Sequence, residues 1–170
     1  YTVSFVTADF TITQAALTVT VDTDQTKVYG TTDPTLTYSF VGFTNGDTEA
    51  NLDTSVSILR GAGETVGTYS IIAFAAADSN YTISFVNADF TITRALLTVT
   101  ADSDQTKVYG ATDPTLTYSF TGFEFGDVEA DLDTAVSISR AEGEDVGTYT
   151  ITPSAAADSN YTVSFVTADF

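Results

Sequence analysis

Four aspartates form two closely spaced pairs, Asp22 with Asp24 and Asp102 with Asp104, and carry the best-placed carboxylates for binding a ligand. Calcium takes about six to eight oxygen ligands, and carboxylates supply them. Each pair lies at the end of an expected strand, near an expected domain junction, where a bound ion would stiffen the chain. We therefore predict calcium at Asp22, Asp24, Asp102 and Asp104 and expect no other cofactor.

The second candidate is the heptapeptide DQTKVYG, which occurs unchanged at residues 24–30 and 104–110. Its Lys and Tyr side chains could contact a ligand. Turn chemistry offers a different explanation, because Gly30 allows a positive φ, Tyr29 can pack on a sheet, and Asp33-Pro34 starts the next turn. We interpret the heptapeptide as a turn after the first strand that binds nothing.

Catalytic chemistry has little support in the composition. Cys and His are absent, which excludes a thiol nucleophile, a Ser-His-Asp triad and the usual zinc ligands. Two carboxyl groups about 5–10 Å apart could hydrolyse a glycoside. Chance pairs are expected among 23 acids, however, and no pocket-forming insertion interrupts the sequence. We predict that the chain is not an enzyme.

The net charge of −18, from 23 acids and 5 bases, restricts the partners. Nucleic acids and anionic membrane surfaces both require Lys and Arg, so neither is expected to bind. No apolar stretch reaches about 18 residues, so we expect no membrane insertion. Acidity of this size favours solubility and mutual repulsion, as on an exported surface protein.

An internal repeat of 80 residues organises the chain. Residue n is identical to residue n+80 at 59 of 80 positions without a gap, which gives two copies and ten residues of a third. Solenoid repeats are shorter, at about 20–50 residues, whereas 80 residues suit a small independent domain.

Strand alternation locates the boundary between copies. Phe90 and Ile92 are apolar at even positions, but Leu97 and Val99 are apolar at odd positions. Because side chains alternate between the two faces of a strand, a slip of one residue turns the next strand toward a different core. We predict a first repeat domain at residues 15–94, a second at 95–170 with its last strand truncated, and C-terminal strands of a preceding repeat at 1–14.

The junction contains neither Gly nor Pro, so we expect a stiff joint with Leu96 or Ala16 wedged between the domains. Within the second copy, the acidic run GDVEADL at residues 126–132 predicts one helical turn with Asp127 as its N-cap. The strands expected there, by alternation and turn residues, are 97–101, 115–120, 136–139, 148–151, 161–165 and a closing FTIT-like strand, with 107–109 as a further short one. The chain is thus predicted to be mainly β, as tandem small β-sandwich or β-grasp-like domains with one short helical turn each.

The order KVYG, DPTLTY, GTY and NYT, which covers essentially all of both copies, resembles the MBG-type repeat of large bacterial surface adhesins and exoproteins, in its Tyr-Gly variant. The resemblance implies stalk or extender modules without catalytic residues, and a relation to mucin-binding β-grasp domains.

We therefore predict a structural stalk or fibre segment of an extracellular or cell-surface protein, whose partners are neighbouring repeats and like chains. One alternative is a carbohydrate- or mucin-binding adhesion module. Another is a self-assembling filament subunit, in which residues 1–13 pair with the exposed strand edge of a neighbouring chain.

Overall fold

The computed structural model describes residues 1–170, and its regular structure consists of thirteen strands and two short 3-10 turns. The chain divides into two compact units. The first contains Tyr1–Gln25, Thr35–Ala62 and Tyr69–Phe90, and the second contains Thr26–Pro34, Gly63–Thr68 and Thr91–Phe170. Two short segments of the first sequence repeat thus belong to the same unit as the second repeat.

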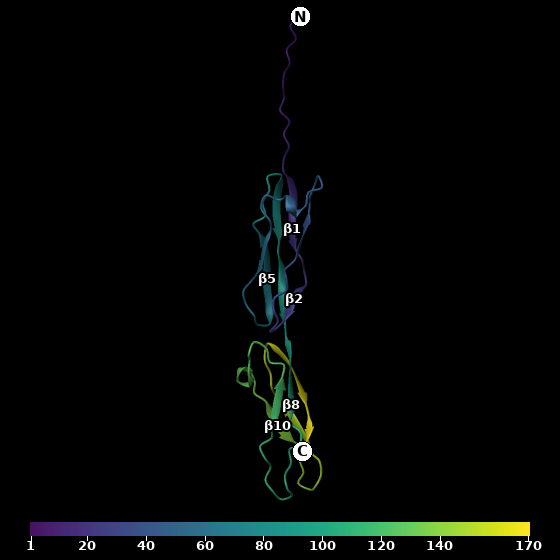
Figure 1. Cartoon of the computed structure of the whole chain (residues 1–170), viewed down its shortest axis with the longest axis vertical. Helices are drawn as coiled ribbons and strands as arrows, with labels where there is room; N and C mark the ends of the chain where they lie inside the picture. Colours follow the sequence, from purple (N-terminus) through teal and green to yellow (C-terminus); the bar gives the residue numbers. More distant parts are fainter. The chain divides into compact units, whose positions relative to one another are not determined.

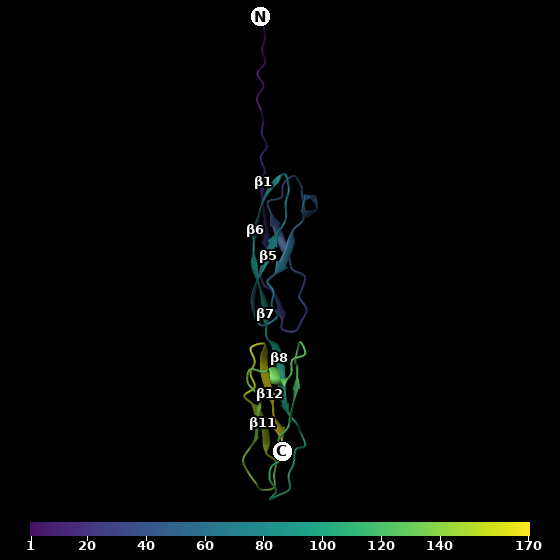
Figure 2. The same cartoon turned by 90° about the vertical axis from the view of Figure 1, so that its left-hand side faces the viewer.

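The first repeat forms two sheets, with strand orders β3-β1-β6 and β2-β7-β5-β4 (Figures 1 and 2). In the first sheet β1 pairs antiparallel with β3 and parallel with β6, so that Ala15 lies opposite Tyr81. The elements are β1 Ala15–Val21, β2 Gln25–Val28, β3 Tyr38–Val41, η1 Glu49–Asn51, β4 Ser57–Arg60, β5 Gly67–Phe74, β6 Tyr81–Val86 and β7 Ala88–Thr93.

The second repeat forms sheets of order β12-β8-β9 and β10-β11-β13. Its parallel pair β8–β12 has the same register, with Ala95 opposite Tyr161. The elements are β8 Ala95–Ala101, β9 Tyr118–Thr121, η2 Glu129–Asp131, β10 Ser137–Arg140, β11 Thr150–Ser154, β12 Tyr161–Val166 and β13 Ala168–Asp169. No strand corresponds to β2, although residues 105–108 have the same sequence as Gln25–Val28.

Both sheets of a repeat contribute to its core. In the second repeat Leu97 and Val99 of β8 are fully buried, as is Ile151 of β11, and β11 contacts β8 and β12 of the other sheet. The prediction of mainly β tandem domains is confirmed. Each repeat's helical turn has only three residues, so two facing sheets, as in a sandwich, describe the repeat better than a sheet covered by a helix.

Burial follows the predicted change of alternation near residue 95. Phe90 and Ile92 are buried on one side of it, and Leu97 and Val99 on the other. Leu96 is 63% exposed, so the expectation that it wedges between domains is wrong, while the same expectation for Ala16 stays a prediction. The domain limits at 14/15 and 94/95 stay a prediction about the sequence repeats, since the compact units are divided differently.

The predicted N-cap of the second helical turn is also wrong. Val128 occupies the N-cap position of η2, and its backbone N–H donates to Asp131 Oδ2 at 2.9 Å. Thr48 and Asn51 form the same bond in the first repeat. Asp127 lies one residue earlier, and its carboxylate accepts hydrogen bonds from tyrosines instead.

Residues 1–14 contain no strand or helix, and their side chains are exposed. In Figures 1 and 2 this segment extends away from β1. Its first ten residues are identical to residues 161–170, which form β12, β13 and Phe170 in the second repeat. The same sequence is therefore paired at one end of the chain and unpaired at the other.

Candidate docking site at the Tyr-Gly turn

Lys27 of the heptapeptide lies on β2. Its ammonium group is buried and lies 2.7 Å from Asp33 Oδ1, with Glu64 as a second partner. Burial alone would lower the pKa of Lys27, but the hydrogen bonds to Asp33 and Glu64 outweigh it and raise the pKa. Lys27 is therefore occupied by two acids of its own neighbourhood.

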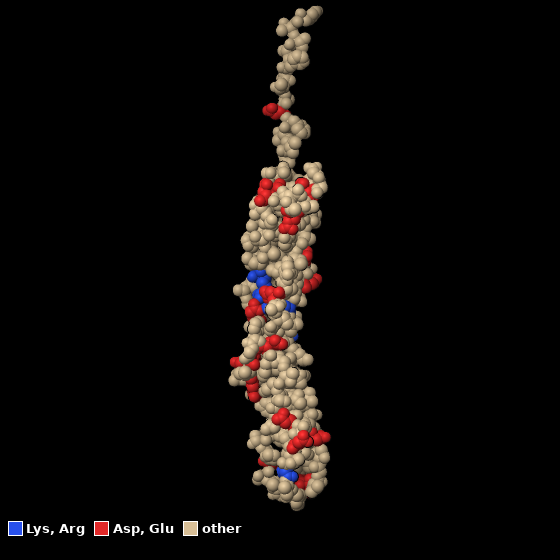
Figure 3. All heavy atoms as spheres, viewed as in Figure 1, with Lys and Arg blue, Asp and Glu red and all other residues tan.

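Lys107 has the corresponding partners in the second repeat, where it lies 2.6 Å from Asp113 and also contacts Glu144. Arg140 binds the same two acids, at 2.7 Å from Asp113 and 2.8 Å from Glu144. Hydrogen bonds from Arg140 and Lys107 lower the pKa of Asp113 to about 2. Figure 3 shows the few Lys and Arg atoms of one face lying beside acidic atoms.

Aromatic rings hold Arg140 in place. Its guanidinium carbon lies 5.3 Å from the ring centroids of both Tyr149 and Phe170, a distance typical of cation–π contacts. Arg60 has equivalent contacts with Tyr69 and Phe90. These charged groups pair with acids and aromatic rings of their own repeat, so their role is structural.

Tyr29 directly follows β2 and belongs to the second compact unit. Its side chain is only 7% exposed, and its backbone N–H donates to the Thr93 carbonyl at 2.8 Å. Its hydroxyl donates to Asp127 Oδ2 at 3.0 Å, and its ring makes edge contacts with Tyr161 and Phe125 at 5.4 and 5.3 Å. Burial, and then the bond to Asp127, raise the pKa of Tyr29 to about 12.

Two backbone positions complete this site. Gly30 has φ +86°, as the turn interpretation requires, and a Cβ there would overlap the side chain of Glu124. The backbone N–H of Val66 donates to Asn160 Oδ1 at 3.0 Å. We call Tyr29, Gly30 and Val66 the turn set, and Asp127, Asn160 and Tyr161 the acceptor set.

The turn interpretation agrees with the positive φ of Gly30, and that the heptapeptide binds no ligand stays a prediction. Tyr29 was expected to pack on its own sheet, but it contacts the acceptor set, whose residues come from the second repeat. Nothing local to the heptapeptide indicates this contact. The one relevant signal is the divergence between copies at Phe125, where the first repeat has Asn45.

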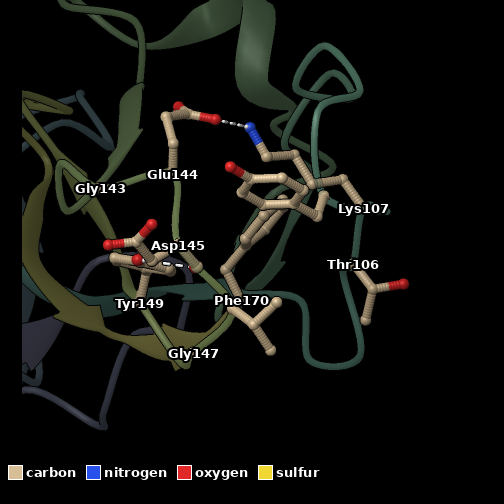
Figure 4. A pocket seen from close by; sticks show the side chains of 10 residues that line it. Thr106, Lys107, Gly143, Glu144, Asp145, Gly147, Tyr149 and Phe170 are labelled. Atoms are coloured by element: carbon tan, nitrogen blue, oxygen red, sulfur yellow. Dashed lines mark hydrogen bonds and ion pairs between the residues drawn. The ribbon is translucent and has the colours of Figure 1, made fainter.

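The second repeat has the same turn residues without these contacts. Tyr109 is 69% exposed, whereas Tyr29 is buried. Beside Tyr109 lies a cavity of about 150 Å³ that Lys107, Tyr149 and Phe170 help to line (Figure 4). Pockets for small molecules usually enclose about 300–1,000 Å³, so this one is small for a glycan site.

The aspartates predicted to bind calcium do not form a cluster of metal ligands. Asp22 follows β1, and its backbone carbonyl accepts a hydrogen bond from the side-chain Nε2 of Gln25, while Asp24 adopts φ +63°. At Thr93, the last residue of β7, the backbone carbonyl accepts its hydrogen bond from Tyr29 and not from Asp22 or Asp24. No group of three or more acidic side chains is arranged to hold a metal ion. Calcium at Asp22, Asp24, Asp102 and Asp104 stays a prediction.

Two-sheet repeats linked by a short strand junction, each with a glycine turn, define a class of tandem β modules. The chain belongs to the family of MBG domains of the YGX type, whose model matches residues 17–91 and 97–170. Each match contains one Tyr-Gly pair, at Tyr29-Gly30 and Tyr109-Gly110. The family is a structural, non-enzymatic type of repeat domain that occurs in extracellular surface proteins.

A search of curated proteins found no similar sequence. The structure has no helix with the length and apolar character needed to cross a membrane.

Proposed function

We propose that this chain is a non-enzymatic stalk or extender segment of a large bacterial extracellular or cell-surface adhesin-like protein. The observation that supports this function is the burial of Tyr29 against Asp127 and Tyr161. Tyr29 of the first repeat contacts Asp127 and Tyr161 of the second repeat, and modules that are joined in series require such contacts.

The mechanism is mechanical and not chemical. A buried Tyr hydroxyl that donates to a carboxylate forms a charge-assisted bond, and the edge contacts with two rings add to it. The Val66–Asn160 bond lies at a second point of the same unit. Contacts at several points resist bending better than a single flexible linker does, so consecutive repeats transmit force and hold a distal binding domain away from the cell.

The test measures whether the two repeats tumble together. Backbone ¹⁵N relaxation of the full chain should give the same rotational correlation time for amides in β1 and in β8. Substituting Tyr29→Ala should lower both correlation times and separate them, because it removes the hydrogen bond and the ring contacts. Tyr109→Ala is the matched control, since Tyr109 is exposed and its loss should leave the correlation times of β1 and β8 equal to each other.

Independent tumbling of the two repeats in the unsubstituted chain would reject the stalk mechanism. Titration with mucin and a glycan array provides a second measurement on the same protein. Saturable binding of a glycan would favour the adhesion-module alternative, which places recognition in this fragment and not in a distal domain.

A further inference from the structure

The outward face of β4 and β5 in the first repeat carries three large apolar side chains. Leu59 of β4 is 44% exposed, and Ile72 and Phe74 of β5 are 37% and 41% exposed. Leu59 lies opposite Ile72 in the strand pair, and Phe74 is two residues further along β5, on the same face. Because the Cβ atoms of opposite residues lie about 4.5–5.5 Å apart, the three side chains form one surface, which we call the apolar patch.

The second repeat has the same two strands without the apolar patch. Hydroxyl residues occupy the three corresponding positions, namely Ser139, Thr152 and Ser154. The register is the same, with Ser139 opposite Thr152. The inward position between them is unchanged, since Ile71 and its counterpart Ile151 are both fully buried. The sheet therefore forms without large apolar residues on its outward face, and folding of the repeat does not explain the apolar patch.

The adjacent repeat in the chain does not cover this face. The first repeat is followed by the second, and its apolar patch is exposed. The second repeat is preceded by the first, and its hydroxyl residues at the same positions are exposed as well. The face is thus open both in a repeat with a neighbour after it and in a repeat with a neighbour before it. A partner for the apolar patch has to be another molecule.

Charge distinguishes between the possible partners. The chain has 23 acids and 5 bases, but residues 54–62 and 69–77, which contain β4 and most of β5, hold no acid and one base, Arg60. A basic partner would be attracted to the acidic remainder of the surface and not to this face. A second copy of the chain, with its own net charge of −18, meets the least repulsion where acids are absent.

We propose that two copies of this chain associate through the apolar patch, with the outward faces of β4 and β5 of the two copies packed against each other. Leu59, Ile72 and Phe74 of one copy meet the same residues of the other, as the inner faces of two sheets do about 10 Å apart in a sandwich. The contact uses the same surface twice, so it is isologous and closes at the dimer. It goes beyond the proposed stalk function, because it joins separate chains and not consecutive repeats.

The size of the apolar patch predicts a weak dimer. Three side chains that are each about two-fifths exposed offer much less area than the roughly 800 Å² per partner of a standard interface. Asp89 of β7, the next strand of the sheet, alternates with the buried Phe90 and points outward, so a carboxylate remains near the rim of the face. We therefore expect association at high protein concentration and high ionic strength.

Sedimentation velocity over a range of concentrations at high ionic strength tests the proposal. The unsubstituted chain should show a monomer–dimer equilibrium that shifts toward the dimer as concentration rises. The triple substitution Leu59→Ser, Ile72→Thr and Phe74→Ser should weaken dimerisation by about tenfold or more, because it removes the apolar contact. Each new residue already occupies the corresponding position of β10 or β11, so far-UV circular dichroism should show an unchanged β content.

A matched control and a converse set of substitutions accompany the test. Val41 of β3 is 69% exposed, lies in the other sheet of the first repeat and corresponds to Thr121, so Val41→Thr should leave dimerisation unchanged. The converse set gives the second repeat an apolar patch of its own and should produce stronger association, with species larger than dimers. It consists of Ser139→Leu, Thr152→Ile and Ser154→Phe.

A chain that stays monomeric at every concentration overturns the proposal, and so does a dimer that survives the triple substitution. Unchanged association in the converse set would also reject it, because the three side chains would then not suffice. If a monomeric chain bound a glycan saturably and the triple substitution removed that binding, the face would be a ligand site and not a dimer contact. The relaxation experiment on Tyr29, at low concentration, decides the stalk function independently.

Discussion

At the scale of single residues, the Tyr-Gly pair has one conformation and two environments. Gly30 and Gly110 adopt nearly the same positive φ, and each follows the same six residues. Only Gly30 faces another side chain, that of Glu124. The turn is therefore a local property of the heptapeptide, whereas the contact depends on what the rest of the unit brings to it.

This difference can be measured with alanine at both glycines. A non-glycine residue in left-handed conformation costs about 1–2 kcal/mol, so Gly110→Ala should lower the free energy of unfolding by that amount. Gly30→Ala should cost at least about 1 kcal/mol more, because its Cβ also overlaps Glu124. Urea denaturation of the two variants gives the comparison. Equal losses would mean that Glu124 does not pack against Gly30.

Asp113 makes a second prediction at this scale, on pH dependence. Its pKa is lowered to about 2 by hydrogen bonds from Arg140 and Lys107. A lowered pKa means that the folded state favours the ionised carboxylate, so this stabilisation is complete above the ordinary value near 4 and is lost as the pH falls toward 2. Melting temperatures measured from pH 5 to pH 2 should fall less steeply in Asp113→Asn than in the unsubstituted chain.

Asp9→Asn is the control for this measurement, because Asp9 is exposed in the segment before β1. It should leave the slope of the melting temperature against pH unchanged. A slope for Asp113→Asn identical to that of Asp9→Asn would show that the pairs of Asp113 with Lys107 and Arg140 do not persist in solution.

At the scale of strands, local alternation predicted most of the fold, and remote pairing explains what it missed. The strands around Leu97 and Val99 follow from apolar residues at every second position. By contrast, QTKV is a strand at Gln25–Val28 and is not one at 105–108. Pairing with β7 through Thr93 makes that difference, and a sequence window of four residues contains no information on it.

The candidate site was less predictable for the same reason. Asp127 looked like a helix cap because an acid before a short turn usually is one. Its carboxylate is instead used by Tyr29 and Tyr161, which lie 98 and 34 residues away along the chain. Contacts at such separations depend on how strands pair, which no single residue type specifies.

The change of alternation near residue 95 supplies the prediction at this scale. Leu96 and Leu97 are neighbours of the same type, but Leu96 is 63% exposed and Leu97 is fully buried. Leu97→Ala should lower the free energy of unfolding by about 2–5 kcal/mol, since it leaves a cavity in the core. Leu96→Ala should change it by about 0.5 kcal/mol or less. If both variants lost similar amounts of unfolding free energy, Leu96 would be as buried as Leu97, and the register of β8 described here would be wrong.

At the scale of the whole molecule, charge opposes both compactness and association. The net charge is −18, and Lys27, Lys107 and Arg140 are already bound by neighbouring acids. The acids in these pairs are exposed, and ion pairs open to solvent contribute about 0–1 kcal/mol each and are weakened by salt. The repulsion among the remaining acids extends over more of the surface, so we expect screening to stabilise the chain overall.

The melting temperature should therefore rise with sodium chloride, as the Debye length shrinks from about 30 Å at 0.01 M to about 10 Å at 0.1 M. A fall would mean that the ion pairs of Lys27, Lys107 and Arg140 outweigh the repulsion.

Calcium chloride at matched ionic strength separates screening from site binding. A further rise with calcium that disappears on substituting Asn for Asp102 and Asp104 would assign the ion to these acids. Equal melting temperatures in the two salts would reject the calcium prediction there, because a bound ion must stabilise the state that binds it.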